Sequence, residues 1–308
     1  MTITPPHHPT LLKRIGNTPL VRLEFDIKPT ILAKLEYLNP GGSIKDRPAL
    51  FMVEQAERDG RLKPGGTIVE ASSGNQGIAL AMIGAIKGYP VIITVPDRTS
   101  FEKIATLQAY GAKVYVCPDT DDLEDPDGYH AKAKEICKKT PDAFMPNQYY
   151  NVQNVKAHYT TTGPEIWEQT QGKLTHCFLG MGSCGTISGV GRYLKEKNPA
   201  IKIIGVDAAT SKRSCPDNPK AYKTEGIGVD VISDTLDMSV IDDIVLMKDE
   251  DAFATTRKIA KQGYLVGLSS GSVVHAILGY VDKLSADDIV VTIFADSGRA
   301  YLSKVFNV

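Results

Sequence analysis

The sequence lacks the patterns that mark disulfide frameworks, zinc sites and membrane spans. Its five cysteines are odd in number and far apart, and none forms a C-x-x-C pair, which argues against a disulfide framework or a zinc site. The longest apolar run, residues 77–95, is interrupted by Lys87, Gly88 and Pro90, and the N-terminus has no basic stretch before an apolar segment. We expect no signal peptide, no membrane span and a cytoplasmic location.

The sequence also lacks an excess of either charge. Its 35 Lys and Arg residues nearly balance 36 Asp and Glu residues, which leaves a formal net charge of −1. This balance gives no electrostatic case for binding nucleic acid or an anionic membrane. The chain shows no repeat and no low-complexity segment, and 308 residues with 42% hydrophobic content can bury one large or two modest cores. A small molecule is the expected partner.

Short β-branched runs alternate with longer helical patterns. Strands are predicted at 67–71, 90–96, 113–118, 175–182 and 201–208, and helices at 76–88, 100–111, 129–140 and 186–198. This alternation is typical of βαβ units and predicts an α/β fold with a mostly parallel sheet. A domain boundary is predicted within 141–150. The acidic stretch 119–128 is predicted to be a solvated loop, because its spacing fits no calcium-binding pattern.

Ligands of open α/β sheets bind at the carboxyl ends of the strands, where two Ser- and Gly-rich loops stand out. In GMGSCGTISG (180–189) a strand runs through glycines and hydroxyl residues into a helix, which indicates a phosphate cradle. It is neither a Walker A loop nor a G-x-G-x-x-G fingerprint, and the alternative is a turn that only caps the helix. In ASSGNQG (71–77), amides and side chains could hold a carboxylate or a cofactor edge, and N-capping is again the alternative.

Two further loops carry candidate groups. LNPGGSIKDRPA (38–49) contains one lysine at the start of a helical pattern, a suitable place for an amine that acts as nucleophile and proton carrier. The alternative is a solvated lysine. GLSSGS (267–272) precedes an apolar helical run, and its hydroxyls are candidates either for a ring heteroatom or for capping.

Taken together, the motifs of this chain resemble those of the fold type II pyridoxal-phosphate enzymes over roughly residues 12–308. Within that group the chain resembles the cysteine synthases, especially the B type, and the catalytic core of the cystathionine β-synthases. The motifs are IGNTPLVRL (15–23), NPGGSIKDRPA (39–49), EASSGNQGIALAMI (70–83), AHYTTTGPEIWEQT (157–170), GMGSCGTISG (180–189), GIG (226–228) and GLSSGS (267–272).

The resemblance implies a tryptophan synthase β-like fold of two three-layer αβα domains with mostly parallel twisted sheets. A larger cofactor-binding domain would comprise residues 1–40 and 146–308. A smaller mobile domain, residues 41–145, would carry the loop that binds the substrate carboxylate. A homodimer is also implied. We expect no haem-binding extension and no C-terminal regulatory domains.

The same resemblance assigns roles to individual residues, with pyridoxal 5′-phosphate as cofactor and no metal. Lys45 would form the internal aldimine and act as base at the substrate α-carbon. Asn75 would bind the cofactor ring hydroxyl, and Ser269 would face the pyridine nitrogen. The cofactor phosphate would be held by Gly182, Ser183, Cys184, Gly185 and Thr186. The substrate carboxylate would be surrounded by Ser72, Ser73, Gly74, Gln76 and Gln148, with Gly226 to Gly228 near its amino group.

The implied reaction is β-replacement on an activated serine such as O-acetylserine. It would proceed through an α-aminoacrylate intermediate, with sulfide as nucleophile and L-cysteine as product. A catalytic Lys45 must be neutral part of the time, so we expect its pKa to be lowered. A first alternative is the cystathionine β-synthase type of condensation of serine with homocysteine. A second uses O-phosphoserine with sulfide or an amine nucleophile, its phosphate bound by Lys212, Arg213 or Lys223. A third is a scaffolding relative without catalysis, against which Lys45 argues.

Three residues depart from the pattern of these families. Thr usually stands where this chain has Ser72 and Gln76. Gln76 keeps hydrogen-bonding capacity but reaches further, so we expect it to influence substrate size or the choice of nucleophile. Cys184 stands where Gly, or Thr in the B type, is usual. We interpret it as a small side chain whose backbone N–H is used, and the alternative is a redox role.

Overall fold

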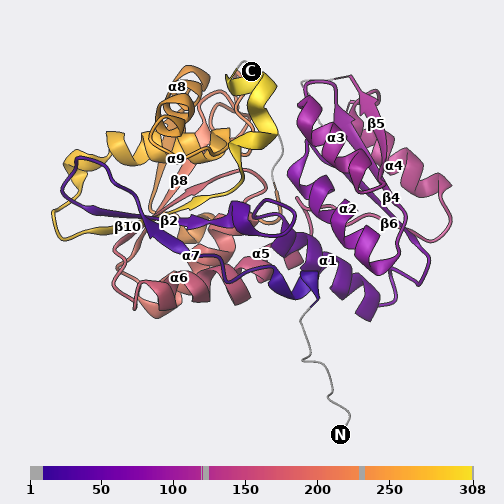
Figure 1. Cartoon of the computed structure of the whole chain (residues 1–308), viewed down its shortest axis with the longest axis horizontal. Helices are drawn as coiled ribbons and strands as arrows, with labels where there is room; N and C mark the ends of the chain where they lie inside the picture. The colour runs from indigo at the N-terminus through magenta and orange to yellow at the C-terminus, as the bar shows by residue number, and fades with distance from the viewer. Residues whose placement is uncertain (1–9, 119, 121–124, 229–232, 307–308) are drawn as a thin grey trace, which may run out of the picture.

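The computed structural model describes residues 10–118, 120, 125–228 and 233–306, and it contains two separate β-sheets, each packed between helices (Figure 1). The larger sheet has six strands in the order β1-β2-β10-β7-β8-β9, and the smaller has four in the order β5-β4-β3-β6. Only the β1–β2 pair is antiparallel among these strands. The prediction of an α/β fold with mostly parallel sheets is confirmed.

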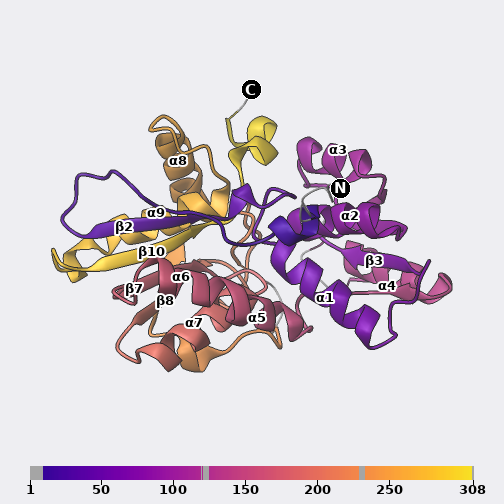
Figure 2. The ribbon, with the colours of Figure 1, turned by 60° about the horizontal axis from the view of Figure 1, so that its bottom comes forward.

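The larger sheet is buried on both faces, as parallel sheets are. Along β7, Cys177 and Leu179 join the core beneath α6 and α7, whereas Phe178 joins the core beneath α8 and α9, because successive side chains of a strand point to opposite faces. Figure 2 shows these two helical layers on either side of the strands. The strands are β1 (Leu20–Arg22), β2 (Thr30–Leu35), β7 (His176–Gly180), β8 (Lys202–Ala208), β9 (Asp243–Met247) and β10 (Ile289–Phe294). The helices are α5 (Gln153–Ala157), α6 (Gly163–Gln169), α7 (Gly185–Lys197), α8 (Asp249–Ala260) and α9 (Leu268–Gly279).

The smaller sheet is likewise covered by helices on both faces. Ile68 and Ile93 pack against the helices α1 and α2, whereas Val69 and Ala71 pack against α4 on the opposite face. Its strands are β3 (Thr67–Ala71), β4 (Val91–Pro96), β5 (Lys113–Cys117) and β6 (Ala143–Phe144). Its helices are α1 (Asp46–Arg58), α2 (Asn75–Lys87), α3 (Phe101–Ala109) and α4 (Tyr129–Lys139).

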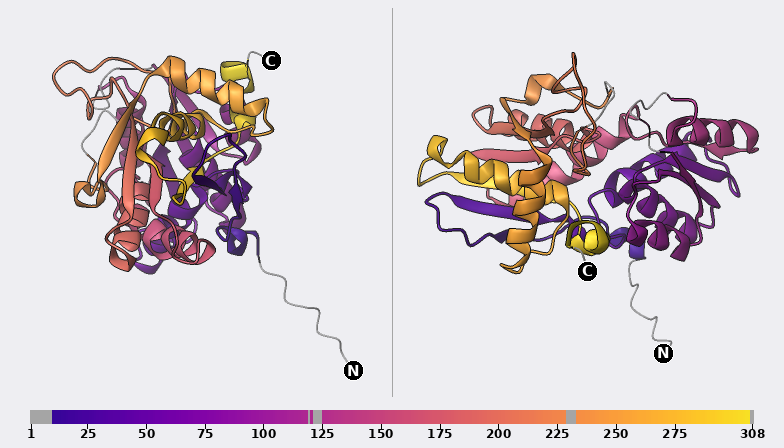
Figure 3. Two further views of the ribbon diagram at one scale, coloured as in Figure 1. Left: turned by 90° about the vertical axis from the view of Figure 1, so that its left-hand side faces the viewer. Right: turned by 90° about the horizontal axis from the view of Figure 1, so that it is seen from above.

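Short helices complete the chain. Those of the 3-10 type are η1 (Leu11–Arg14), η2 (Glu36–Leu38), η4 (Met238–Val240), η5 (Val281–Lys283) and η6 (Gly298–Tyr301), and those of the π type are η3 (His158–Thr162) and η7 (Leu302–Phe306). Viewed from above, the C-terminal segment lies between the two sheet units (Figure 3). This segment therefore reaches both sides of the junction at which the site is built.

The predicted strands and helices all occur, with ends within two residues of those expected. The two-residue strand β6 lies inside 141–150, where the sequence predicted a boundary. Of the acidic stretch 119–128, positions 119 and 121–124 lie outside the described residues. All five cysteines are free thiols. Within the described ranges, no helix is long and apolar enough to cross a membrane, and no group of three His, Cys, Asp or Glu side chains could hold a metal ion.

Candidate active site

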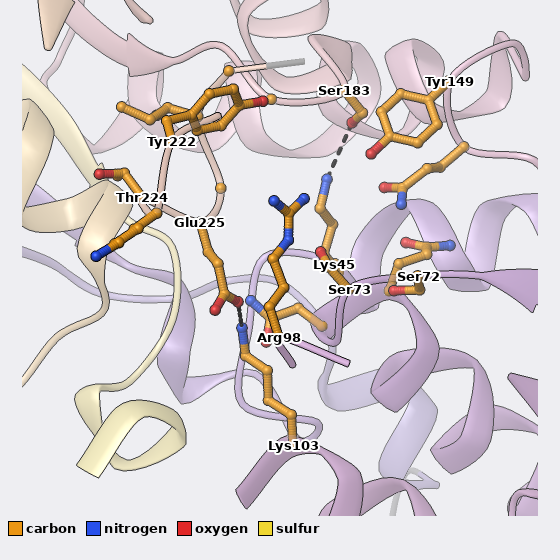
Figure 4. A pocket seen from close by; sticks show the side chains of 18 of the residues that line it. Lys45, Ser72, Ser73, Arg98, Lys103, Tyr149, Ser183, Tyr222, Thr224 and Glu225 are labelled. Atoms are coloured by element: carbon orange, nitrogen blue, oxygen red, sulfur yellow. Dashed lines mark hydrogen bonds and ion pairs between the residues drawn. The ribbon is translucent and has the colours of Figure 1, made fainter. Parts of the chain in front are cut away.

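Two adjoining cavities open at the junction of the two sheet units, and five residues line both. The shared residues are Lys45, Asn75, Gly182, Ser183 and Gly226. The inner cavity is also lined by Cys184, Thr186, Ser269 and Asp296. The outer cavity adds Ser72, Ser73, Gln76 and Gln148 (Figure 4). Most of the site residues predicted from sequence are thus gathered in one place, because the loops after β3, β7 and β10 meet there.

Lys45 stands immediately before α1 and directs its amine across the cavity. Its Nζ donates a hydrogen bond to Ser183 Oγ at 3.1 Å (Figure 4). Burial lowers the pKa of Lys45 to about 8, while the charges of Cys184 and Asp296 act in the opposite direction. A neutral amine is therefore accessible near physiological pH, as expected for a lysine that acts as nucleophile and base. This lowering has the direction expected from the sequence.

A buried charge network fixes the helix that carries Lys45. Arg47 binds Glu36 through Nε and Nη2, each at 2.7 Å, and binds Glu165 through Nη1 at 2.7 Å and Nη2 at 2.8 Å. Lys34 Nζ lies 2.7 Å from the same Glu165 carboxylate. Burial opposes the ionisation of Glu165, but Arg47 and Lys34 lower its pKa to about 2. Bidentate pairs of this kind are geometrically strict, so they hold α1 against the larger sheet.

The predicted phosphate loop, residues 182–186, lies between β7 and α7 and is packed too closely for side chains at two positions. A Cβ on Gly182 would lie 2.8 Å from Gly226 O, and one on Gly185 would lie 2.0 Å from Asn154 Oδ1. Cys184 is the N-cap of α7 with φ +63°. A helix N-terminus at a cavity wall favours an anion, because its first amides are unpaired and its dipole is positive.

The environment of the Cys184 thiol disfavours redox chemistry. It is buried, and its Sγ donates to Gly182 O at 3.3 Å. Burial raises the pKa of Cys184 to about 11, so the reactive thiolate is scarce at neutral pH. This environment supports the interpretation of Cys184 as a small structural side chain.

Two polar residues that the sequence analysis did not assign support the phosphate loop. Asn154 Nδ2 donates to Ser183 Oγ at 3.0 Å and to Gln148 O at 2.9 Å. His158 Nε2 pairs with Thr186 Oγ1 at 3.2 Å, and burial lowers the pKa of His158 well below its usual value. Neither residue follows a strand, so the search of strand-to-helix loops missed them, although His158 lies in a quoted motif.

Asn75 and Ser269 lie on the walls of the inner cavity. Asn75 Nδ2 donates to Asp296 Oδ2 at 2.7 Å. Ser269 is in the first turn of α9, and its hydroxyl makes no hydrogen bond to the part of the chain that the structure describes. Asp296 also lines this cavity, and burial raises its pKa. Beside the hydroxyls of the loop 182–186, the cavity walls thus offer the Ser269 hydroxyl and the Asn75 amide to a ring with polar edges.

The substrate loop, residues 72–76, both caps α2 and lines the outer cavity. Ser72 Oγ accepts from the N–H groups of Gly74 at 3.1 Å and Gly77 at 3.0 Å, so the capping alternative describes this side chain. Gln76 is only 1% exposed, and both polar atoms of its amide lack a partner among the described residues. A buried unpaired amide is costly, and Gln76 lines the outer cavity, so its amide is available to a ligand there.

Gln148 reaches the outer cavity from a segment that Glu70 holds. Glu70 Oε2 accepts from Asn147 N at 2.7 Å. Burial raises the pKa of Glu70 to about 8, against the lowering effect of hydrogen bonds from the backbone of Asn147 and Gln148. The side chain of Glu70 on β3 therefore fixes the backbone that presents Gln148.

Several predicted residues are not in the cavity walls. Gly74 lies against Lys103, and Gly185 lies against Asn154, so each contributes close packing. Arg213 donates to Met181 O at 2.9 Å and to Gly182 O at 3.1 Å, and it also pairs with Asp207. Arg213 therefore supports the backbone of the phosphate loop. Lys223, in contrast, lines the outer cavity.

These residues fit pyridoxal phosphate as a resident group. An amine of lowered pKa, a tightly packed anion loop at a helix N-terminus, an amide and a neutral hydroxyl surround one cavity. Fold and site together define an α/β enzyme in which a lysine faces a candidate phosphate cradle between two mostly parallel sheets.

The chain belongs to the pyridoxal-phosphate dependent enzyme family, whose model matches residues 11–296. Its cofactor is pyridoxal 5′-phosphate. The predicted family and cofactor are confirmed.

The chain is similar both to cystathionine β-synthases and to a cysteine synthase, the two groups expected from the sequence. Cystathionine β-synthase of Saccharomyces cerevisiae is 44% identical over 94% of this chain, which spans 61% of that relative's length. Cysteine synthase of Staphylococcus aureus is 40% identical, with 94% of each chain covered. The crystal structure of an O-acetylserine dependent cystathionine β-synthase from Helicobacter pylori is 38% identical, covers 99% of each chain and superposes with a TM-score of 0.86.

Proposed function

We propose that the chain catalyses β-replacement on an activated serine, with O-acetylserine and sulfide as substrates and L-cysteine as product. The observation that carries the proposal is the Lys45 amine, held 3.1 Å from Ser183 Oγ in the phosphate loop with its pKa lowered to about 8 by burial. The Staphylococcus aureus relative named cysteine synthase supports this choice.

Lys45 removes and returns the proton at the substrate α-carbon. The Ser183 hydroxyl and the Arg47 network hold the amine in place, which makes the proton transfer intramolecular and faster by several orders of magnitude. Bound pyridoxal phosphate supplies the electron sink that stabilises negative charge at that carbon. Ser269 lines the inner cavity and would hold the ring nitrogen of the bound cofactor with a neutral hydroxyl, which would favour loss of a β-substituent over transamination.

The outer cavity receives the amino acid. Ser73, Gln76 and Gln148 line it beside the Lys45 amine, and the unpaired amide of Gln76 supports a role in binding the substrate carboxylate. The close backbone turn of Ser72 and Gly74 shapes this wall, and Gly226 adds the opposite wall.

A second candidate is condensation with a thiol that carries its own carboxylate, such as homocysteine. Arg98 and Lys223 line the same cavity, and Figure 4 shows the Arg98 side chain directed into it. Cations at this position favour an anionic nucleophile, or the phosphate of O-phosphoserine, over sulfide alone. The Helicobacter pylori relative bears the name of such an enzyme.

The proposal includes a cytoplasmic homodimer and a mobile unit of residues 41–145. The free thiols of the chain suit a reducing compartment. The cavity is lined by residues from both sheet units, such as Gln76 and Ser183, so movement of one unit would admit substrate.

An assay with the full chain loaded with pyridoxal phosphate tests the proposal. O-acetylserine, O-phosphoserine and serine are each combined with sulfide and with homocysteine, and products are measured by mass spectrometry. We expect cysteine from O-acetylserine and sulfide to form fastest, and Lys45→Ala to lower the rate by about 10³-fold or more, as loss of a nucleophile or base does. Cystathionine without cysteine would support the second candidate and overturn the first.

A further inference from the structure

Lys103 is a buried cation in the outer cavity to which the proposed reaction gives no role. Its side chain is 2% exposed although it belongs to the surface helix α3. Nζ donates to the Glu225 carboxylate (Figure 4). It also donates to the Tyr301 hydroxyl at 3.0 Å and lies 4.1 Å from the Tyr301 ring centroid. Burying a charge is costly unless it is well paired. These contacts therefore define a specific position for the ammonium group.

One arm of contacts runs from Lys103 to the cofactor side of the site. The Tyr301 hydroxyl accepts from Lys103 and donates to Asp296 Oδ2 at 2.6 Å. The same Asp296 oxygen accepts from Asn75 Nδ2 at 2.7 Å. The Lys103 ammonium is thus linked by a continuous hydrogen-bonded chain to Asn75, the first residue of α2.

A second arm runs through Glu225 to the Gly226 loop, residues 225–228. Glu225 is followed by Gly226, whose φ of +89° favours glycine. A Cβ on Gly226 would lie 2.9 Å from Ser269 Cβ, and one on Gly182 would lie 2.8 Å from Gly226 O. The backbone of this loop is therefore in close contact with both Ser269 and the phosphate loop, and its position depends on what holds Glu225.

The alkyl stem of Lys103 makes a third contact, with the substrate loop. A Cβ on Gly74 would lie 2.4 Å from Lys103 Cδ. Gly74 has φ +147° and is the N-cap of α2, so both its conformation and its neighbour require glycine. The stem thus supports the turn from which Asn75 and Gln76 emerge.

We propose that Lys103 is a positioning residue that holds the substrate loop and the Gly226 loop at a fixed separation across the cavity. The inference rests on the proposed function only in that these loops are taken to bind substrate and cofactor. It predicts that loss of the ammonium group loosens both loops together, since Lys103 is the member common to both arms. Loss of one partner loosens one loop.

Hydrogen exchange measured by mass spectrometry on the full chain loaded with pyridoxal phosphate tests this role without any turnover. Lys103→Met keeps an apolar stem and removes the charge. Lys304→Met is the matched control, because Lys304 Nζ donates to the same Glu225 carboxylate at 2.6 Å but does not line the cavity. We expect Lys103→Met to exchange about tenfold faster in peptides covering 72–77 and 224–228, and Lys304→Met less than about twofold faster.

Two further variants separate the arms and remain informative if Lys103→Met does not fold. Tyr301→Phe breaks the first arm, and we expect faster exchange in 72–77 alone. Glu225→Gln weakens the second, and we expect faster exchange in 224–228 alone. The helix α4 (Tyr129–Lys139) is the internal reference and should keep its exchange rate.

Three results would overturn the proposal. They are unchanged exchange in both loops of Lys103→Met, equal effects of Lys103→Met and Lys304→Met, or loosening of both loops by each single-arm variant. Because no substrate is turned over, a negative result here is distinguishable from a failure of the proposed sulfide reaction.

Discussion

Gln76 combines two properties that normally exclude each other, since its primary amide is buried and both polar atoms are unpaired among the described residues. Leaving such groups without partners costs about 1–3 kcal/mol. The loss is tolerated where function needs it, as with other residues that lower stability at active sites. The amide is therefore best explained by a ligand that supplies the missing hydrogen bonds.

Replacing Gln76 tests this explanation, because the change should raise the stability of the ligand-free protein and weaken substrate binding. Gln76→Met keeps the length of the side chain and removes the unpaired amide. We expect the free energy of unfolding of the ligand-free protein to rise by about 1 kcal/mol, and KM for the amino-acid substrate to rise about tenfold through lost hydrogen bonds. Chemical denaturation and steady-state kinetics measure the two.

Gln76→Thr is the matched comparison, because it restores the residue usual in the related families. We expect it to change the preference among amino-acid substrates while leaving cofactor content unaltered. Identical kinetics of wild type, Gln76→Met and Gln76→Thr on all substrates would show that Gln76 does not contact substrate.

At the scale of elements, the N-terminus of α7 is the part of the site most constrained by packing. Gly185 begins this helix, and a Cβ there would lie 2.0 Å from Asn154 Oδ1. Asn154 in turn donates to Ser183 Oγ. A methyl group at 185 must therefore displace Asn154 and disturb the hydroxyl that contacts Lys45.

Gly185→Ala should weaken cofactor binding by about a hundredfold, since a misplaced anion loop loses several charge-assisted hydrogen bonds. Equilibrium dialysis against pyridoxal phosphate measures the affinity. Gly279→Ala is the control, because a Cβ at that last position of α9 meets nothing within 4 Å. Equal affinities for Gly185→Ala and Gly279→Ala would contradict the assignment of this loop to the phosphate.

The sequence predicted the elements that carry local signals. Alternating apolar patterns located β3, β4 and β8, and clusters of Gly and Ser located the loops after β3 and β7, because backbone conformation and hydrogen bonding within a few residues leave a pattern in the chain. The strands β1, β2, β6, β9 and β10 were not predicted, and the two residues of β6 are too few to show a period. The predicted C-terminal ends of β7 and α3 lie two residues beyond the observed ends. The glycine and polar residues that follow do not interrupt the strand or helix pattern of the sequence.

At the scale of the whole molecule, the supports of the site depend on contacts between distant segments. Asn154, Glu70 and Arg47 act on residues 29, 77 and 118 positions away, and no local motif encodes such a contact. The partner of the Lys45 amine, Ser183, is 138 positions away. The resemblance supplied the list of site residues, and capping was already an alternative for the loop of Ser72, but the Lys103 contacts needed the three-dimensional structure.

The packing of the two sheet units brings the Lys45 amine to the loop after β7. In the proposed function this amine moves the α-proton of an amino acid. Proton exchange at the α-carbon of L-alanine in D₂O, followed by nuclear magnetic resonance, tests the claim without a leaving group or nucleophile. The cofactor-loaded protein should exchange this proton, and Lys45→Ala with cofactor bound should be slower by about 10³-fold. Equal exchange rates for the two proteins, or none with wild type, would contradict the account.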